Sequence, residues 1–196
     1  MTKTLPPLIG LTGPAGCGKD TVRSILELHH GYHGLALADP IRSMITALLR
    51  TAGADACYAH ARGLKEEIIP GLDVSYRHLA QTLGTEWGRN TMGPDFWTVI
   101  AAARIADLCG DNFGTINFVV SDIRFDHEAE WLLQRGGVIW QIMRPGLPGV
   151  RPHVSEEGIA PPFISQTICN GGTQDELRQC VQSALDHCTH NSGANR

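Results

Sequence analysis

The sequence predicts an α/β fold, a three-layer α/β/α sandwich around a largely parallel sheet of about five strands, with a small lid. Three observations predict it. Short apolar runs alternate with helical patterns along the 196 residues, a glycine-rich loop joins the first run to a helix, and carboxylates stand directly after other runs. Strands that alternate with helices are typical of βα units, whose strands lie parallel.

Five apolar runs are expected to form the sheet: residues 8–12, 34–38, 116–120, 138–143 and 164–169. Each run is short and rich in aliphatic residues, as buried strands are. The first run is expected to be the central strand.

Helices are expected between and after these strands, at residues 22–28, 41–52, 75–89, 94–108, 126–136 and 174–187. Pro40 opens the second helix, because its missing N–H costs nothing in a first turn. Ser75 caps the third helix, since a serine side chain accepts a free N–H of the first turn. The pair Gly136–Gly137 ends the fifth helix.

Two stretches carry neither pattern. Residues 53–73 are polar and contain no motif. Residues 144–162 contain five prolines and three glycines, which predicts a loop or lid. The length of the chain suits one domain over residues 1–188, followed by a flexible tail at 189–196.

The composition narrows the classes of function. The net charge of −4 argues against a general nucleic-acid binder, which is usually basic. No apolar run approaches the length of a membrane span, and the first residues lack the apolar core of a signal peptide. The six cysteines form no C-x-x-C pair and no zinc pattern, so reduced thiols in a cytoplasm are expected.

The glycine-rich loop carries the strongest functional signal. Residues 13–19 match the G-x-x-x-x-G-K pattern of a phosphate-binding P-loop, or Walker A motif. There, backbone N–H groups and the positive end of the following helix point at one spot, where a polyphosphate binds. Lys19 adds a mobile positive charge for the β- and γ-phosphates. The residues expected to contact the polyphosphate are Gly13, Ala15, Gly16, Cys17, Gly18, Lys19, Asp20 and Thr21.

Three residues are candidates for binding Mg²⁺. Asp20 occupies the position where a Ser or Thr hydroxyl usually binds the metal, and the hydroxyl follows at Thr21. Either Asp20 holds the metal directly or through water, or Asp20 caps the helix and Thr21 takes the metal role. Asp122 follows an apolar run in the manner of a Walker B element, where it would order Mg²⁺ or its waters, or cap a helix.

Two arginines stand near the carboxyl ends of predicted strands, where the ligands of open α/β sheets bind. Arg42 lies one helical turn after Asp39, and Arg124 lies two residues beyond Asp122. An arginine at such a place clamps a phosphate with paired hydrogen bonds. The alternative for Arg124 is a surface residue paired with Glu128.

Further polar candidates lie on a helix and on the predicted lid. Arg77 and Gln81 share a helix face, and Arg89 lies near the end of the same helix. Phosphoryl transfer needs a lid, because water must be excluded and charge neutralised, although a basic loop is also common as plain surface. The cationic and polar residues of the lid are Arg144, Arg151, His153, Ser155 and Glu156.

Taken in order, these pieces resemble the deoxynucleoside monophosphate kinases of bacteriophages, a branch of the P-loop nucleoside monophosphate kinases. The resemblance covers residues 8–187, nearly the whole chain. It is carried by Gly13–Thr21, Ala38–Arg42, Gln81–Glu86 with Arg89, Val120–Phe125 with Glu128, Gly136–Gly137, Arg144–Pro145, His153–Glu156 and Asn170–Thr173. The Asp after the P-loop lysine is shared with that family.

The resemblance implies a P-loop NTPase fold and transfer of the ATP γ-phosphoryl group, with Mg²⁺, to a deoxynucleoside 5′-monophosphate. It implies an acceptor-binding helical region at 40–108 and a lid at 144–162. Catalytic roles are implied for Lys19, Asp122, Arg124 and Arg144, and a place against the donor adenine for Asn170, Gly171 and Thr173. The implied acceptor-binding residues are Asp39, Arg42, Arg77, Gln81, Arg89, Trp97, Arg124, Phe125, Glu128, His153, Ser155 and Glu156. Either Trp97 or Phe125 is expected to stack on the base.

The resemblance also implies small-molecule nucleotides as partners, neither nucleic acid nor a membrane, a homodimer, and a phage source with the host cytoplasm as location. Two alternatives stay open. Dephospho-coenzyme A kinases and the phosphomevalonate kinases of animals use similar P-loops and lids with other acceptors. A non-catalytic nucleotide-binding switch is the third reading, although the chain contains no N-K-x-D guanine box.

Overall fold

A computed structural model describes residues 5–110, 116–147 and 158–191 of the chain. The chain divides into two compact units: unit 1 comprises Met1–Ala36 and Ala103–Arg196, and unit 2 comprises Leu37–Ala102. The single domain over residues 1–188 that the sequence suggests stays a prediction.

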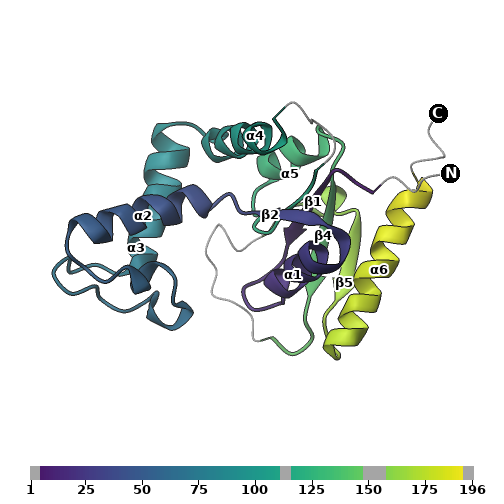
Figure 1. Ribbon diagram of the computed structural model, residues 1–196, viewed down its shortest axis with the longest axis horizontal. Helices are drawn as coiled ribbons and strands as arrows, with labels where there is room; N and C mark the ends of the chain where they lie inside the picture. Colours follow the sequence, from purple (N-terminus) through teal and green to yellow (C-terminus); the bar gives the residue numbers. More distant parts are fainter. Residues whose placement is uncertain (1–4, 111–115, 148–157, 192–196) are drawn as a thin grey trace. The chain divides into compact units, whose positions relative to one another are not determined.

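Unit 1 contains a five-stranded parallel sheet in the order β2-β3-β1-β4-β5, with β1 at its centre (Figure 1). Its strands are β1 (Leu8–Thr12), β2 (Tyr32–Leu35), β3 (Asn117–Val120), β4 (Val138–Met143) and β5 (Gln166–Cys169). The predicted parallel sheet of about five strands is therefore confirmed, and β1 and β4 have the predicted bounds.

Two strands differ from the prediction at their ends. The second was expected at residues 34–38, but β2 ends at Leu35, which pairs with Val120 at the end of β3. Residues 36–38 lie beyond the end of that neighbouring strand and lead into a helix instead. The last strand begins at Gln166 rather than at residue 164, because Pro161–Phe163 form a 3-10 turn just before it.

Helices cover both faces of this sheet. They are α1 (Lys19–His30), α5 (Asp126–Leu133) and α6 (Gln174–Asn191). Ile9 and Leu11 of β1 pack in one buried cluster with side chains of α1 and α6. A Cβ added to Gly10 would lie 2.8 Å from Leu132 of α5. Because successive strand residues point to opposite faces, α1 and α6 cover one face and α5 covers the other, which confirms the three layers.

The last helix is longer than predicted. It was expected to end at residue 187, with a flexible tail from 189, but α6 continues to Asn191. Its buried stripe of Val181, Ala184 and Leu185 packs on the core, and Cys188 extends that stripe by another turn. The apolar face therefore supports one more turn of helix than the sequence pattern suggested.

Unit 2 is helical. It contains α2 (Asp39–Thr51), α3 (Tyr76–Gln81), the π-helix η3 (Thr82–Thr91) and the first part of α4 (Phe96–Cys109). Between α2 and α3 lie two short 3-10 turns, η1 (Ala56–Ala59) and η2 (Arg62–Leu64). The predicted cap at Ser75 is confirmed, since its side chain accepts the N–H of His78 at 3.2 Å.

The single α-helix predicted over 75–89 is wrong beyond Gln81, where the chain widens into η3. Trp97 explains why glycines occur there. A Cβ at Gly88 would lie 2.4 Å from its ring, and its indole N–H donates to the Gly84 carbonyl at 2.8 Å. A wide helix with two glycines thus leaves room for a large buried side chain. Although π-helical segments are rare in proteins, those that occur frequently lie at functional sites.

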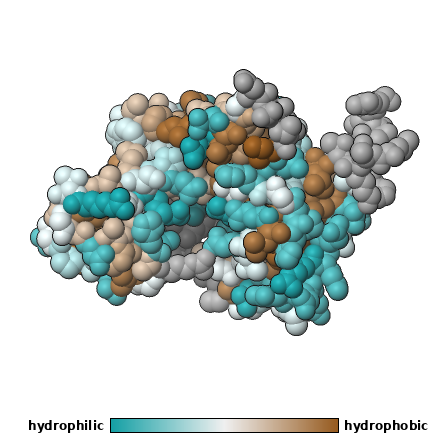
Figure 2. Space-filling view, viewed as in Figure 1, coloured by the Kyte–Doolittle hydropathy of each residue, from teal (hydrophilic) through white to brown (hydrophobic). Residues whose placement is uncertain are grey.

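The surface of unit 1, the described helices and the cysteines bear on the predictions from composition. Hydrophilic residues dominate the face of unit 1 seen in Figure 2, and hydrophobic residues appear in separate patches. Within the described residues, every helix is too short or too polar to cross a bilayer. All six cysteines are free thiols, and burial raises the pKa of the Cys188 thiol.

Candidate active site

The predicted glycine-rich loop joins the central strand β1 to α1. Its three glycines adopt positive φ angles of 134° at Gly13, 79° at Gly16 and 105° at Gly18. Glycine is required most strictly at Gly13, where an added Cβ would lie 2.3 Å from the carbonyl oxygen of Ile142 in β4. The loop is therefore folded tightly against the carboxyl end of the sheet.

Gly13→Ala is expected to lower the free energy of unfolding by more than about 2 kcal/mol, because a disfavoured φ and a backbone clash act together. Gly31→Ala is the matched control. Gly31 also has a positive φ, of 70°, but no atom lies within 4 Å of the added Cβ, so backbone strain alone should cost about 1 kcal/mol. Denaturant unfolding of both variants measures the difference. Equal losses would contradict the close approach to β4.

Lys19 bends back over this loop. Its Nζ donates to the carbonyls of Gly13 at 2.6 Å and Pro14 at 2.8 Å, and lies 3.8 Å from the Cys17 sulfur. The Cys17 side chain is fully buried in the core of unit 1. Any contact of Cys17 with a phosphate would therefore come from its backbone.

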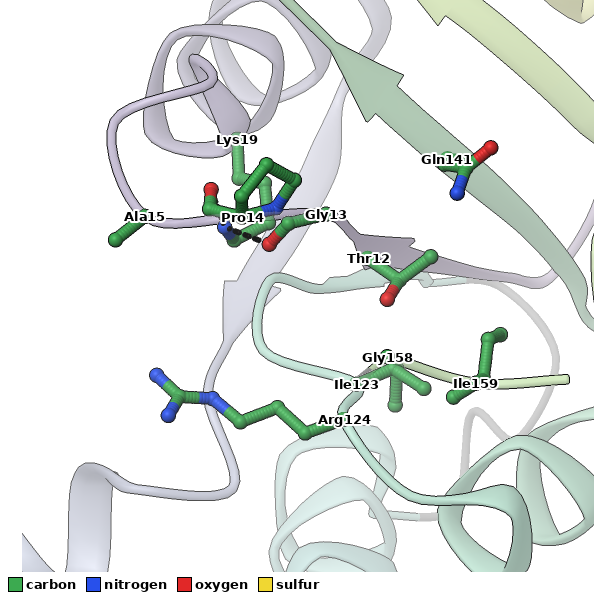
Figure 3. Close-up of a pocket in the computed structure, with 10 residues that line it drawn as sticks. All are labelled: Thr12, Gly13, Pro14, Ala15, Lys19, Ile123, Arg124, Gln141, Gly158 and Ile159. Atoms are coloured by element: carbon green, nitrogen blue, oxygen red, sulfur yellow. Dashed lines mark hydrogen bonds between the residues drawn. The ribbon is translucent and has the colours of Figure 1, made fainter. Parts of the chain in front are cut away.

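A cavity of about 160 Å³ opens beside the loop (Figure 3). It is lined by Thr12, Gly13, Pro14, Ala15, Lys19, Ile123, Arg124, Gln141, Gly158 and Ile159. Lys19 and Arg124 come from opposite sides of it, each from a different element (Figure 3). Two cations around one cavity at the carboxyl ends of parallel strands suit a polyanionic ligand.

Six of the lining residues were not candidates in the sequence, and two of these six have polar side chains. Thr12 and Gln141 are register partners on β1 and β4, and they lie side by side only because those strands pair. The alternation of side chains along a strand predicts on which face of the sheet each residue lies, but it does not predict which strand pairs with it. The topology was therefore needed to find them.

The segment after β3 places Arg124 beside the loop. The N–H of Ile123 donates to the Leu11 carbonyl at 3.1 Å, so this segment stays next to β1. Glu128 is 1% exposed, and its Oε2 accepts the backbone N–H groups of Arg124 at 2.8 Å and Phe125 at 3.2 Å. The Glu128 carboxylate therefore fixes the backbone of residues 124 and 125. Its burial argues against a direct contact with the acceptor substrate, which the resemblance implies for Glu128.

Glu128→Ala is expected to cost about 1–3 kcal/mol of stability, because two N–H groups lose their buried acceptor. The acceptor contact that the resemblance implies for Arg124 predicts a higher acceptor KM as well, since the backbone that carries Arg124 is released. Glu130→Ala, an exposed glutamate on the same helix, controls for the lost charge. A loss of stability without a change in acceptor KM would show that Glu128 does not position Arg124.

The three candidate metal ligands lie in unit 1. Asp20 is exposed in the first turn of α1, Thr21 follows half-buried, and Asp122 is half-buried two residues beyond β3. Among the described residues no group of three or more His, Cys, Asp or Glu forms a metal cage. Such a cage is not needed for Mg²⁺ in phosphoryl transfer, because this ion keeps several waters and binds one or two carboxylates with substrate phosphates.

The candidate arginines of unit 2 form ion pairs or donate a hydrogen bond to a backbone carbonyl. Arg42 pairs with Asp39 at 2.8 Å, and Arg77 pairs with Glu66. Arg89 donates to the Gly84 carbonyl at 3.0 Å. Gln81, the last residue of α3, is exposed.

Of the two aromatic residues expected to stack on a base, the structure favours Phe125. Trp97 is 1% exposed, and its ring packs edge-on against Phe96 and at a tilt against Trp87. The stacking expected of it is therefore corrected: its ring belongs to the core of unit 2. Phe125 is half-buried and lies parallel to the His127 ring, with centroids 5.6 Å apart.

The turn after β5 contacts the glycine-rich loop directly. The Asn170 side-chain amide donates to the Cys17 carbonyl at 2.9 Å. Thr173 has a local role, because its N–H and hydroxyl both donate to Glu176 at the start of α6. The contact between residues 170 and 17 carries no sequence signal, since it depends on where β5 lies in the sheet.

The candidates of the predicted lid are described only in part. Arg144 follows β4 directly and is exposed. His153, Ser155 and Glu156, together with Arg151, lie outside the described residues. At the far end of the lid, Ile159 is buried and the Ala160 N–H donates to the Asp126 side chain at 2.8 Å.

A parallel sheet with β1 leading through a G-x-x-x-x-G-K loop into a helix defines a protein of the P-loop class. Comparison with solved structures supports this class of fold. The Thermus thermophilus protein TT1252 superposes with a TM-score of 0.53 at 18% identity, over 94% of this chain and 98% of the other. The dephospho-CoA kinase of Campylobacter jejuni gives 0.51 at 13% identity, over 95% and 98%. At such identities the likeness shows the fold alone.

The chain belongs to the deoxynucleotide monophosphate kinase family, whose model matches residues 55–181. The deoxynucleotide monophosphate kinase of Enterobacteria phage T4 is 29% identical over 111 residues, which cover 57% of this chain and 45% of that protein. A protein of Acanthamoeba polyphaga mimivirus, provisionally named for the same activity, is 27% identical over 190 residues, or 93% and 97% of the two chains. The predicted resemblance and the phosphotransferase class are thereby confirmed.

Proposed function

We propose that this protein transfers the γ-phosphoryl group of ATP to a deoxynucleoside 5′-monophosphate, yielding the diphosphate and ADP. One observation carries the proposal beyond family membership: the P-loop with Lys19 and the arginine Arg124 line one cavity in unit 1. A kinase needs cations on both sides of the transferred group, because charge is spread over its oxygens in the transition state.

The donor phosphates are proposed to bind the loop 13–18 and the first turn of α1. The N–H groups at this helix start have no acceptor within the helix, and the helix dipole adds positive potential there. The Lys19 ammonium, which now donates to two loop carbonyls, would exchange them for β- and γ-phosphate oxygens.

Mg²⁺ fits the oxygen ligands that the loop region offers. Asp122 and either Asp20 or Thr21 would hold it, directly or through its waters. Bound there with ATP, the ion supplies charge neutralisation between the β- and γ-phosphates.

The acceptor monophosphate is proposed to bind unit 1 at the cavity that Arg124 lines. Arg124 and Phe125 of unit 1 would bind its phosphate and stack on its base, and Glu128 would hold both in place through their backbone N–H groups. For unit 2, the acceptor contacts that the sequence implies for Asp39, Arg42, Arg77, Gln81 and Arg89 stay predictions. Paired N–H donors on arginine suit a phosphate dianion.

The reaction requires that ATP and the acceptor phosphate are positioned in line, and it requires no general base. An oxygen of the acceptor phosphate is already an anionic nucleophile, and it attacks the γ-phosphorus in line. A bond forms from that oxygen to phosphorus, and the bond from phosphorus to the β–γ bridging oxygen breaks, which releases ADP. Lys19, Arg124 and Arg144 are proposed to neutralise the negative charges of ATP and of the acceptor phosphate as the two approach.

A panel of acceptors tests the proposal against its alternatives. ADP release from Mg·ATP is measured with the four deoxynucleoside monophosphates, the four ribonucleotides, dephospho-coenzyme A and phosphomevalonate. Turnover with at least one deoxynucleotide is expected. Turnover with only a non-nucleotide would favour one of the other kinase readings, and ATP binding without any transfer would favour a switch. The homodimer and the host cytoplasm stay predictions.

A further inference from the structure

We infer that Asn170 is a positioning residue that keeps the phosphate-binding loop in its binding conformation. The inference rests on the proposed function only in assuming that this loop binds a polyphosphate. It replaces the contact with the donor adenine that the sequence implied for Asn170.

Asn170 is fixed at both its backbone and its side chain. Its N–H donates at 2.7 Å to the carbonyl of Met143, the last residue of β4. Its side-chain Nδ2 donates at 2.9 Å to the carbonyl of Cys17. The sheet therefore holds Asn170, and Asn170 in turn holds the loop.

This hydrogen bond sets the direction of one N–H of the loop. A peptide group is planar and trans, so the Cys17 carbonyl and the Gly18 N–H point in opposite directions. Fixing the carbonyl toward Asn170 turns the Gly18 N–H to the other side of the loop. That N–H lies just before α1, among the groups that bind phosphate in P-loops.

The close fit at Gly18 points to the same role. A Cβ on Gly18 would lie 2.2 Å from Asn170 Nδ2, and Gly18 has a φ of 105°. The amide thus lies directly against the glycine, leaving no room for a side chain between them. The Cys17 side chain is buried in the core. A buried side chain and the hydrogen bond from Asn170 therefore both fix the peptide between residues 17 and 18.

The rest of the turn packs separately from the loop. A Cβ on Gly171 would lie 3.2 Å from Pro145, and Glu176 accepts the N–H of Thr173 at 2.7 Å. Glu176 therefore supports the same turn without a described hydrogen bond to the loop. This separation provides a control variant.

The test compares two ligands, ATP and inorganic tripolyphosphate, each with Mg²⁺ at fixed ionic strength. Tripolyphosphate carries the phosphates but no adenine. Asn170→Ala should weaken the binding of both ligands by the same factor, about tenfold, as expected for one lost hydrogen bond that orders a binding group. Amide hydrogen exchange over residues 13–19 should become faster. Glu176→Ala should leave both affinities unchanged.

Two results would overturn the inference. A loss for ATP alone would assign Asn170 to the adenine, and unchanged affinity for both ligands would remove any role in the loop. Asn170→Ser, whose side chain is one atom shorter, repeats the test if the alanine variant does not fold. Failure of the unsubstituted protein to bind either ligand would overturn the proposed function itself, and the inference with it.

Discussion

Lys19→Ala is expected to lower kcat by about 10²- to 10³-fold, the usual effect of removing one preorganised donor from a developing charge. In the structure, the Lys19 ammonium lies within 2.6–2.8 Å of two loop carbonyls. It is therefore held at the loop where the phosphates are proposed to bind. Steady-state ADP release at saturating acceptor measures the effect, and the acceptor KM should change little.

The control for this variant is Arg178→Ala. Arg178 is an exposed residue of α6 that pairs with Asp175 at 2.5 Å, so its replacement removes one positive charge of unit 1 away from the cavity. Its kcat should match that of the unsubstituted protein. If Lys19→Ala retained more than about a tenth of the activity, the charge that Lys19 supplies would not be the main electrostatic contribution of the loop.

Arg124→Ala is expected to raise the acceptor KM by about 10- to 100-fold, as the loss of a charge-assisted hydrogen bond of about 1.5–3 kcal/mol predicts. Arg124 is exposed and lines the cavity opposite Lys19, so its guanidinium is available to a ligand. The affinity for ATP alone should change little. Acceptor titrations at saturating ATP, with ATP binding measured separately, distinguish the two sides of the site.

Arg135→Ala is the matched control for Arg124. Arg135 is exposed, and its guanidinium lies over the Trp131 ring of α5, 5.0 Å from the ring centroid. The variant therefore removes an arginine next to α5 that does not line the cavity. Acceptor kinetics that stay the same in Arg124→Ala would exclude Arg124 from acceptor binding. An equal loss of ATP affinity would move Arg124 to the donor side.

The sheet could be predicted because local signals and tertiary structure agree there. The runs at 8–12 and 138–143 form strands with those bounds, since aliphatic residues between turn formers suit buried strands. The end of β2 could not be predicted, because it depends on where β3 stops. The π-helix η3 could not be predicted either: it follows from the space taken by Trp97, a residue from the next helix.

The placement of candidate residues could be predicted where they follow a motif, since Lys19 and Arg124 line one cavity. It could not be predicted where chemistry depends on contacts between distant segments. The sequence gives Glu128 an acidic side chain near Arg124, but only the structure shows that it is buried and binds backbone N–H groups. The sequence likewise marks Asn170 as a turn residue, and its contact with Cys17 appears only once β5 is placed beside β4.

The most direct test of the central claim follows the phosphoryl group itself. ATP labelled at the γ-phosphate is incubated with the protein, Mg²⁺ and each deoxynucleoside monophosphate in turn. The account predicts that the label appears in the β-position of the deoxynucleoside diphosphate, with one ADP formed for each group transferred. Label that stays in ATP or appears only as inorganic phosphate, with every deoxynucleotide and with ATP bound, would contradict it.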